Sequence, residues 1–459
     1  MLIEDLGSVI RVSSDTWEIE HLRTSGGVWS AVRFATGSRE NLIRHPAGAA
    51  IRFVRPDPQA ESGIFSDYCE HLDRNARLIH EQMPDGNAMV TAEGTFTDEH
   101  GRSIPVGFRR RTEYSPNAPI WTTLEIMSDC GCDGVVELRA FELALRPGLK
   151  RASVRFHPTQ AGGPDLLGGR ADYDLTRTGD VPFMSRFTPI ELAVEGIKVF
   201  PASDLAAWDC GIKPDMGIGL YTIRHSTDGM TLQMSPYCMA LRRVGARVQG
   251  HITYRLGISF SPEQKKDSES HIAAINSDWP SESTIKDLVQ KGISIIRLDN
   301  GYRENGPFWR AGSWPPYDET NMSELRRVID AAHRHGLKVI PSVSIKEFHP
   351  ETTEFAARSH QWMHMPAPSL GIIHNYAGGG EFGAFMCLKS GWREFIKHHV
   401  ERILNGLPWD GLYLHMASPT PCCHPGHSSA LWHTDQEELQ DFLAYCRRQV
   451  GHRLLIVKE

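Results

Sequence analysis

The hydrophobic period of this chain changes once along its length, and this change limits the folds that it can adopt. Residues 251–260 read HITYRLGISF, with apolar side chains at alternate positions, which is the period of a strand with one buried face. Similar short runs occur at 136–145, 152–157 and 217–225, separated by turn-forming residues and without a long helical pattern between them. The first part, 1–265, is therefore predicted to be an antiparallel β-sandwich domain.

Strand and helix periods alternate in the second part, 266–459, which is typical of βα units around a parallel sheet. Five strands are predicted, at 271–276, 294–300, 337–344, 410–416 and 454–459. We therefore predict a (β/α)8-type (TIM) barrel domain that is incomplete. Because a closed barrel needs eight strands to remove its edges, we expect this chain to be truncated or completed by another chain.

The predicted helices of the second part have recognisable ends. The first helix ends at Gly292, and the second has Asn321 as its N-cap with Glu324 three residues later. A third helix covers 392–405, and the last opens on Thr434 in a capping box. These signals place the strand ends, where site residues are expected.

Composition excludes several kinds of partner. A formal charge of −7 over 459 residues, without a basic run interleaved with aromatics, argues against nucleic acid. The chain has no apolar stretch long enough to span a bilayer and no basic region at its start, so we predict a cytoplasmic protein without a membrane partner. Nine scattered cysteines indicate reduced thiols, and homo-oligomer formation stays open.

Four motifs follow one another in the second part. They are LDNGY at 298–302, GSWPPYD at 312–318, SHQWM at 359–363 and DGLYLH at 410–415. In this order they resemble the motifs of clan D glycoside hydrolases, most of all the family 36 α-galactosidases. The resemblance implies a β-sandwich joined to a (β/α)8 barrel, with a sugar site at the mouth of the barrel.

The resemblance also shows a departure at the site. In the family, an aspartate nucleophile stands at the position of His415 and a sugar-binding lysine at that of Tyr413, while the acid/base aspartate lies on a strand beyond Glu459. Glycoside cleavage normally needs two carboxyl groups, and the strand ends of this chain offer Asp299, Glu347 and Glu459. We predict His415, Asp299 and Glu347 as the catalytic residues.

Further residues around the same strand ends are predicted to bind the substrate. Aromatic rings in loops can stack on a pyranose face, and the Pro-rich loop 418–433 is interpreted as a lid that lines the pocket. The predicted binding residues are Asn300, Trp309, Trp314, Tyr317, Trp362, Tyr413, Cys422, His424 and His427.

The sequence therefore predicts a carbohydrate-active protein that hydrolyses or binds an α-linked glycoside or oligosaccharide, with no cofactor and no metal. A first alternative is a non-catalytic sugar-binding pseudoenzyme or a truncated fragment. A second is a zinc-dependent hydrolase that uses the Cys/His loop 415–433, because thiolate and imidazole ligands suit zinc. The spacing in this loop matches no common zinc signature, although its residue types suit zinc. Both alternatives therefore stay open.

Overall fold

A computed structural model describes most of the 459 residues, and the chain divides into two compact units, Met1–Glu263 and Gln264–Glu459. The described residues are 1–35, 40–55, 64–116, 118–147, 151–158, 169–174, 179–184, 187–194, 196–202, 220–226, 228–238, 246–260, 271–275, 279–299, 319–350, 352–365, 371, 373–376, 381–428 and 433–458. Across these residues, no helix has the length and apolar character needed to cross a membrane.

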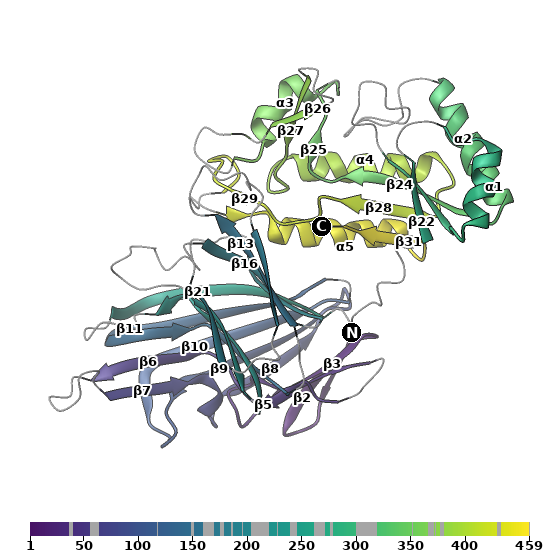
Figure 1. The fold of residues 1–459 in the computed structure, drawn as a ribbon. Helices are drawn as coiled ribbons and strands as arrows, with labels where there is room; N and C mark the ends of the chain where they lie inside the picture. Colours follow the sequence, from purple (N-terminus) through teal and green to yellow (C-terminus); the bar gives the residue numbers. More distant parts are fainter. Residues whose placement is uncertain are drawn as a thin grey trace. The chain divides into compact units, whose positions relative to one another are not determined.

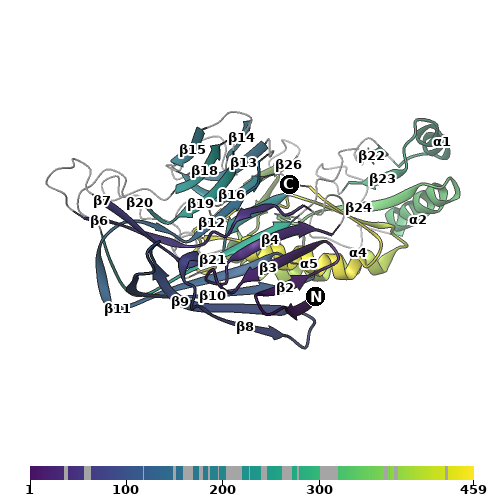
Figure 2. The ribbon, with the colours of Figure 1, turned by 90° about the horizontal axis from the view of Figure 1, so that it is seen from below.

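The first unit consists of antiparallel strands in three sheets (Figure 1). The four-stranded sheet has the order β1-β2-β3-β4, with strands β1 Leu2–Asp5, β2 Val9–Ser13, β3 Trp17–Leu22 and β4 Trp29–Phe34. The five-stranded sheet has the order β15-β18-β19-β12-β5, with strands β5 Ile43–His45, β12 Phe141–Leu145, β15 Gly179–Met184, β18 Leu220–Ser226 and β19 Gly229–Ser235. Its strands β15, β18 and β19 lie side by side in Figure 2.

The largest sheet of the first unit has twelve strands and the main order β10-β9-β7-β6-β11-β21-β17-β16-β13-β14. These strands are β6 Ala50–Arg55, β7 Ile64–Cys69, β9 Ala88–Thr97, β10 Ser103–Tyr114, β11 Ile120–Arg139, β13 Arg151–Pro158, β14 Gly169–Asp174, β16 Phe187–Val194, β17 Ile197–Pro201 and β21 Ala246–Phe260. Two further strands join it, β8 Arg77–Gln82 on β9 and β20 Tyr237–Cys238 on β11, and a single 3-10 turn, η1, covers Glu70–Leu72.

The three sheets share one apolar core, which explains the alternating sequence pattern. Val12 of β2, Leu124 of β11 and Leu232 of β19 are all buried in this core. The prediction of antiparallel strands is confirmed, and the run 251–260 lies within β21. The run 136–145 was predicted as one strand, which is wrong: it is divided between β11 and β12, because the chain passes from one sheet to another at the buried Ala140.

The second unit is built on a parallel sheet with the order β22-β23-β24-β28-β31. Its strands are β22 Ile272–Ile275, β23 Ile295–Leu298, β24 Lys338–Ser344, β28 Gly411–His415 and β31 Leu454–Val457. The five predicted strands are thus confirmed. Within the described residues β22 and β31 do not pair with each other, so the strands form an open sheet and the closed barrel is not observed.

Five helices and short strands surround this sheet in the described part of the second unit. The helices are α1 Glu282–Gln290, α2 Glu319–Arg334, α3 Phe355–Trp362, α4 Trp392–Gly406 and α5 Gln436–Val450, and α4 and α5 lie side by side (Figure 1). The short strands are β25 Glu347–Phe348, β26 Ile373–Tyr376, β27 Glu381–Phe385, β29 Pro421–Cys422 and β30 His433–Thr434. Helices α2, α4 and α5 bury apolar stripes in the core of this unit, as the 3.6-residue period predicts, whereas α3 has no buried residue.

Two helix starts differ from the prediction. Helix α2 begins at Glu319, so the predicted cap Asn321 lies inside the first turn. Helix α5 has Asp435 rather than Thr434 as its N-cap, and the Asp435 side chain makes no capping hydrogen bond. The reason is tertiary, because the carboxylate of Asp435 is bound to Lys346 from another element.

Candidate functional site

The carboxyl ends of three neighbouring strands meet at one edge of the parallel sheet. Asp299 directly follows β23, His415 ends β28, and Ser344 ends β24 opposite His415. Because parallel strands in an open α/β sheet present their carboxyl ends at the same edge, ligands typically bind there. The predicted residues Asp299 and His415 are therefore brought to a common edge by the sheet itself.

Asp299 is held by an ion pair within its own strand end. The Nε and Nη2 groups of Arg297 donate to the two carboxylate oxygens of Asp299 at 2.6 and 2.8 Å. Residues two apart on a strand lie on the same face, which gives this geometry. The Arg297 guanidinium also lies 4.5 Å from the ring centroid of Tyr413, so the predicted residues Asp299 and Tyr413 belong to one cluster.

His415 is neutral at physiological pH. Burial lowers its pKa to about 4, and the nearby charge of Asp299, which acts to raise the pKa, does not overcome burial together with Arg297 and Lys458. A neutral imidazole cannot supply the negative charge that faces an oxocarbenium-like centre. Met416, the next residue, has a φ of 59°, the one positive φ outside glycine in the described chain, a strained conformation of the kind found at functional sites.

Glu347, the second predicted catalytic carboxyl group, has a strongly raised pKa. The residue is 2% exposed, and burial raises its pKa to about 7 against a smaller lowering by the hydroxyl group of Ser344. The backbone N–H of Glu347 also donates to that hydroxyl at 3.3 Å, which connects Glu347 to the strand end opposite His415. At neutral pH a substantial fraction of this carboxyl group is therefore protonated.

The residue before Glu347 forms a buried network that sequence reasoning missed. Nζ of Lys346 donates to both carboxylate oxygens of Asp435, at 2.9 and 2.7 Å, and to Oγ1 of Thr420 at 2.8 Å. The backbone N–H groups of Thr420 and Leu388 donate to the same carboxylate. Lys346 and Asp435 are both fully buried, and they are too far apart in the sequence for any local pattern to connect them.

The sequence predicts Trp362 in a loop, but Trp362 is the last residue of helix α3. Its ring is stacked on Phe348 at a centroid distance of 5.8 Å and packs against Trp392 and Phe395. The aromatic ring thus takes part in the packing of the unit, and contact with a sugar stays a prediction.

The loop 418–433 contributes to a buried group of sulfur and nitrogen atoms. Cys422 and His433 lie on the paired strands β29 and β30, and His427 lies between them in sequence. With Cys387, which the sequence analysis missed, their potential ligand atoms all lie within 4.8 Å of one another. The thiol of Cys387 lowers the pKa of Cys422 against the opposing effect of burial, and burial raises the pKa of Cys387.

The neighbours of these residues point to other contacts. His424 stacks on His427 with ring centroids 4.0 Å apart, and the backbone N–H of Cys423 donates to the carbonyl of Met365. The predicted binding residues Asn300, Trp309, Trp314 and Tyr317 lie outside the described residues, as does Glu459.

Comparison with known proteins gives matches among solved structures alone. No family model and no curated protein matches the chain. The galactosidase domain of the α-galactosidase-sucrose kinase AgaSK matches at 12% identity and a TM-score of 0.43, covering 100% of this chain and 72% of that one. The family GH36 α-galactosidase AgaB from Geobacillus stearothermophilus matches at 10% identity and a TM-score of 0.44, with the same two coverages.

An α-N-acetylgalactosaminidase, NagBb from Bifidobacterium bifidum, matches at 12% identity and a TM-score of 0.36, covering 100% of this chain and 76% of that one. AgaB belongs to GH36, the family whose motifs the sequence resembles. Identity and TM-score are low throughout, so the function proposed below rests on the residues of the site.

Proposed function

We propose that this chain is a carbohydrate-active protein that binds an α-linked glycoside at the carboxyl edge of its parallel sheet and hydrolyses it with Glu347 as the proton donor. In this proposal the N-terminal unit is a β-sandwich domain, and the second unit is part of a (β/α)8-type barrel. The substrate is an oligosaccharide or a smaller glycoside.

One observation carries the proposal: two carboxyl groups beside neighbouring strands lie in contrasting environments. Asp299 faces a guanidinium at hydrogen-bond distance, whereas burial raises the pKa of Glu347 to about 7. Glycoside cleavage needs one protonated carboxyl group to assist the leaving oxygen and one ionised group, and different surroundings are how proteins produce this pair. Asp299, which Arg297 holds through both oxygens, is assigned as the ionised group: it accepts the proton of the attacking water while Glu347 protonates the leaving oxygen.

His415 excludes a mechanism in which a carboxylate nucleophile acts from this position. With a pKa of about 4 the imidazole is neutral at pH 7 and can accept a proton or a hydrogen bond from the sugar, but it forms no glycosyl ester of the kind that a carboxylate forms. A mechanism at this site therefore differs from that of an aspartate nucleophile. Binding without turnover is the second candidate, favoured by this same neutral residue.

The test compares glycosides with good and poor leaving groups on the purified full chain. Nitrophenyl α-glycosides need little acid assistance, whereas unactivated α-linked disaccharides need it fully. We expect Glu347→Gln to slow hydrolysis of the disaccharides by about 10²-fold or more and that of the nitrophenyl substrates much less. Activity of the unchanged protein on disaccharides should fall as the pH rises above about 7, because the acid form of Glu347 is lost.

Glu394→Gln is the matched control, since Glu394 lies on α4 with a side chain that is 68% exposed. Its activity should equal that of the unchanged protein on both substrate classes. Sugar-dependent thermal stabilisation without turnover, lost in Asp299→Asn, would establish the binding role instead. The proposal is contradicted if the unchanged protein neither hydrolyses these nitrophenyl α-glycosides and α-linked disaccharides nor is stabilised by them.

A further inference from the structure

We propose that Cys387, Cys422, His427 and His433 form a closed, four-ligand zinc site with a structural role. This inference rests on residues other than Asp299, Glu347 and His415, so it can be tested independently of the function proposed above. It also revises the prediction that the chain binds no metal.

The four side chains converge from separate segments of the second unit. Cys387 lies between β27 and α4, Cys422 and His433 lie on β29 and β30, and His427 lies in the loop between these two strands. Each offers one ligand atom, and all four atoms lie within 4.8 Å of one another. Two sulfur and two nitrogen ligands at such spacing are a donor set that zinc binds tetrahedrally in structural sites.

Burial distinguishes this group from a chance cluster of surface residues. Cys387, Cys422 and His433 are 0% exposed and His427 is 7% exposed. Two thiolates around a divalent cation make an electrically neutral unit, so the ion removes the cost of burying the sulfur charges.

The hydrogen bonds around the group orient the ligands as a metal requires. Nε2 of His427 lies 2.8 Å from the carbonyl oxygen of Gln361, to which it donates, and this leaves the lone pair of Nδ1 directed to the cluster, 3.6 Å from Sγ of Cys422. The backbone N–H groups of Met365 and His424 each donate to Sγ of Cys422 at 3.4 Å. Such donors stabilise a thiolate, which is the form of cysteine that binds metals.

His433 supplies an independent observation. Its imidazole is completely buried, and apart from the neighbouring thiol of Cys422 neither ring nitrogen has a hydrogen-bond partner among the described residues. A buried polar group whose hydrogen-bonding capacity is not satisfied destabilises the folded state, so native proteins rarely retain one. A bound zinc ion would accept the lone pair of one nitrogen and so accounts for a histidine at this position.

A site with four protein ligands leaves no open position for a catalytic water, so its role is structural. It would join the β29–β30 loop to the segment that leads into α4. His433 is two residues before Asp435, the partner of Lys346, so the ion would also brace the buried network of the second unit.

The experiment measures metal in the purified full chain, produced with added zinc and dialysed without chelator. We expect close to one zinc ion per chain, and we expect the cobalt-substituted protein to show intense visible bands of tetrahedral cobalt with thiolate charge-transfer absorption. The Cys422→Ser and His433→Ala variants should lose the bound zinc, and chelation of the unchanged protein should lower its Tm.

Cys423→Ser and His424→Ala are the controls, because both residues lie in the same loop outside the ligand group. They should retain the full zinc content. If a ligand variant does not fold, the cobalt spectrum of the unchanged protein still decides the question. Protein that carries no transition metal, or in which Cys387 and Cys422 are joined as a disulfide, overturns the proposal.

Discussion

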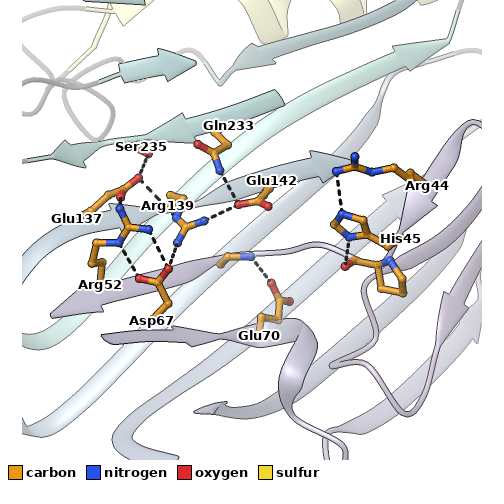
Figure 3. Close-up of polar contacts among 12 residues, drawn as sticks. Arg44, His45, Arg52, Asp67, Glu70, Glu137, Arg139, Glu142, Gln233 and Ser235 are labelled. Atoms are coloured by element: carbon orange, nitrogen blue, oxygen red, sulfur yellow. Dashed lines mark hydrogen bonds and ion pairs between the residues drawn. The ribbon is translucent and has the colours of Figure 1, made fainter. Parts of the chain in front are cut away.

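Both units bury ionisable side chains, but the two units differ in how these side chains are paired and in whether they are charged. In the first unit, Figure 3 shows Arg52 and Arg139 among the carboxylates of Asp67, Glu137 and Glu142. Gln233 and Ser235 add hydrogen bonds to two of these carboxylates. Nearby, the fully buried Glu70 accepts two hydrogen bonds from Arg110, at 2.7 and 2.6 Å. Each of these charges faces an opposite charge.

In the second unit, the adjacent buried residues Lys346 and Glu347 differ in charge state. The charge of Lys346 is paired with that of Asp435, whereas burial raises the pKa of Glu347 to about 7, so a substantial fraction of this carboxyl group is protonated at neutral pH. Structural ion pairs keep both partners charged, while carboxyl groups that act as proton donors need a pKa near the working pH. The difference indicates that the polar network of the first unit serves stability and that Glu347 is the residue of interest for chemistry.

The largest expected effect is the loss of one partner of a fully buried ion pair. Lys346→Met leaves the Asp435 carboxylate buried without its cation, and we expect a loss of about 3–5 kcal/mol in the free energy of unfolding. Arg110→Met should destabilise the first unit by a similar amount, because Glu70 is equally buried. Urea denaturation measures both losses, and a loss below about 1 kcal/mol for either variant would break the comparison.

Glu347→Gln should give a smaller effect that depends on pH. The folded pKa of about 7 lies above the ordinary 4.5, so the stabilising contribution of the protonated form is complete below pH 4.5 and is lost as the pH rises through 7. Gln resembles the protonated acid. The free energy of unfolding of the variant should therefore equal that of the unchanged protein at pH 4 and exceed it by about 3 kcal/mol at pH 8. Denaturation curves across this pH range test the prediction, and parallel curves for the two proteins would refute it.

Asp67→Asn should show the opposite pH dependence at a lower magnitude. Burial raises the pKa of Asp67, but Arg52 and Arg139 together lower it below the ordinary 3.8. Its stabilising contribution is therefore present above pH 3.8 and is lost as the pH falls through the folded value. Because the side chain is 36% exposed, we expect a loss of about 1 kcal/mol at pH 7 that disappears near pH 2, measured by thermal unfolding.

The smallest effect is expected at an exposed pair of the first unit. Arg247 and Asp133 are 3.1 Å apart, but their side chains are 49% and 73% exposed. Water and salt screen this pair, so Arg247→Ala should change the free energy of unfolding by less than about 0.5 kcal/mol. A larger change would mean that the number of ion pairs, and not their burial, governs stability in this unit.

Regular elements could be read from the sequence because they depend on local periods. The five strands of the parallel sheet, the end of α1 before Gly292 and the end of α5 at Gly451 follow from apolar spacing and from glycine, which adopts positive φ at low cost. Errors arose where a distant partner intervened. Asp435 begins α5 without capping it, because Lys346 binds its carboxylate.

The edge at which Asp299 and His415 lie was also predictable, since their places at strand ends are local facts. Tertiary structure alone decided the protonation of two groups: the low pKa of His415 and the raised pKa of Glu347 depend on which atoms exclude water from each group. The sequence likewise presents Cys422, His427 and His433 as one loop. Cys387 joins them because the fold returns to the same point after 34 intervening positions, a proximity in space that no periodicity records.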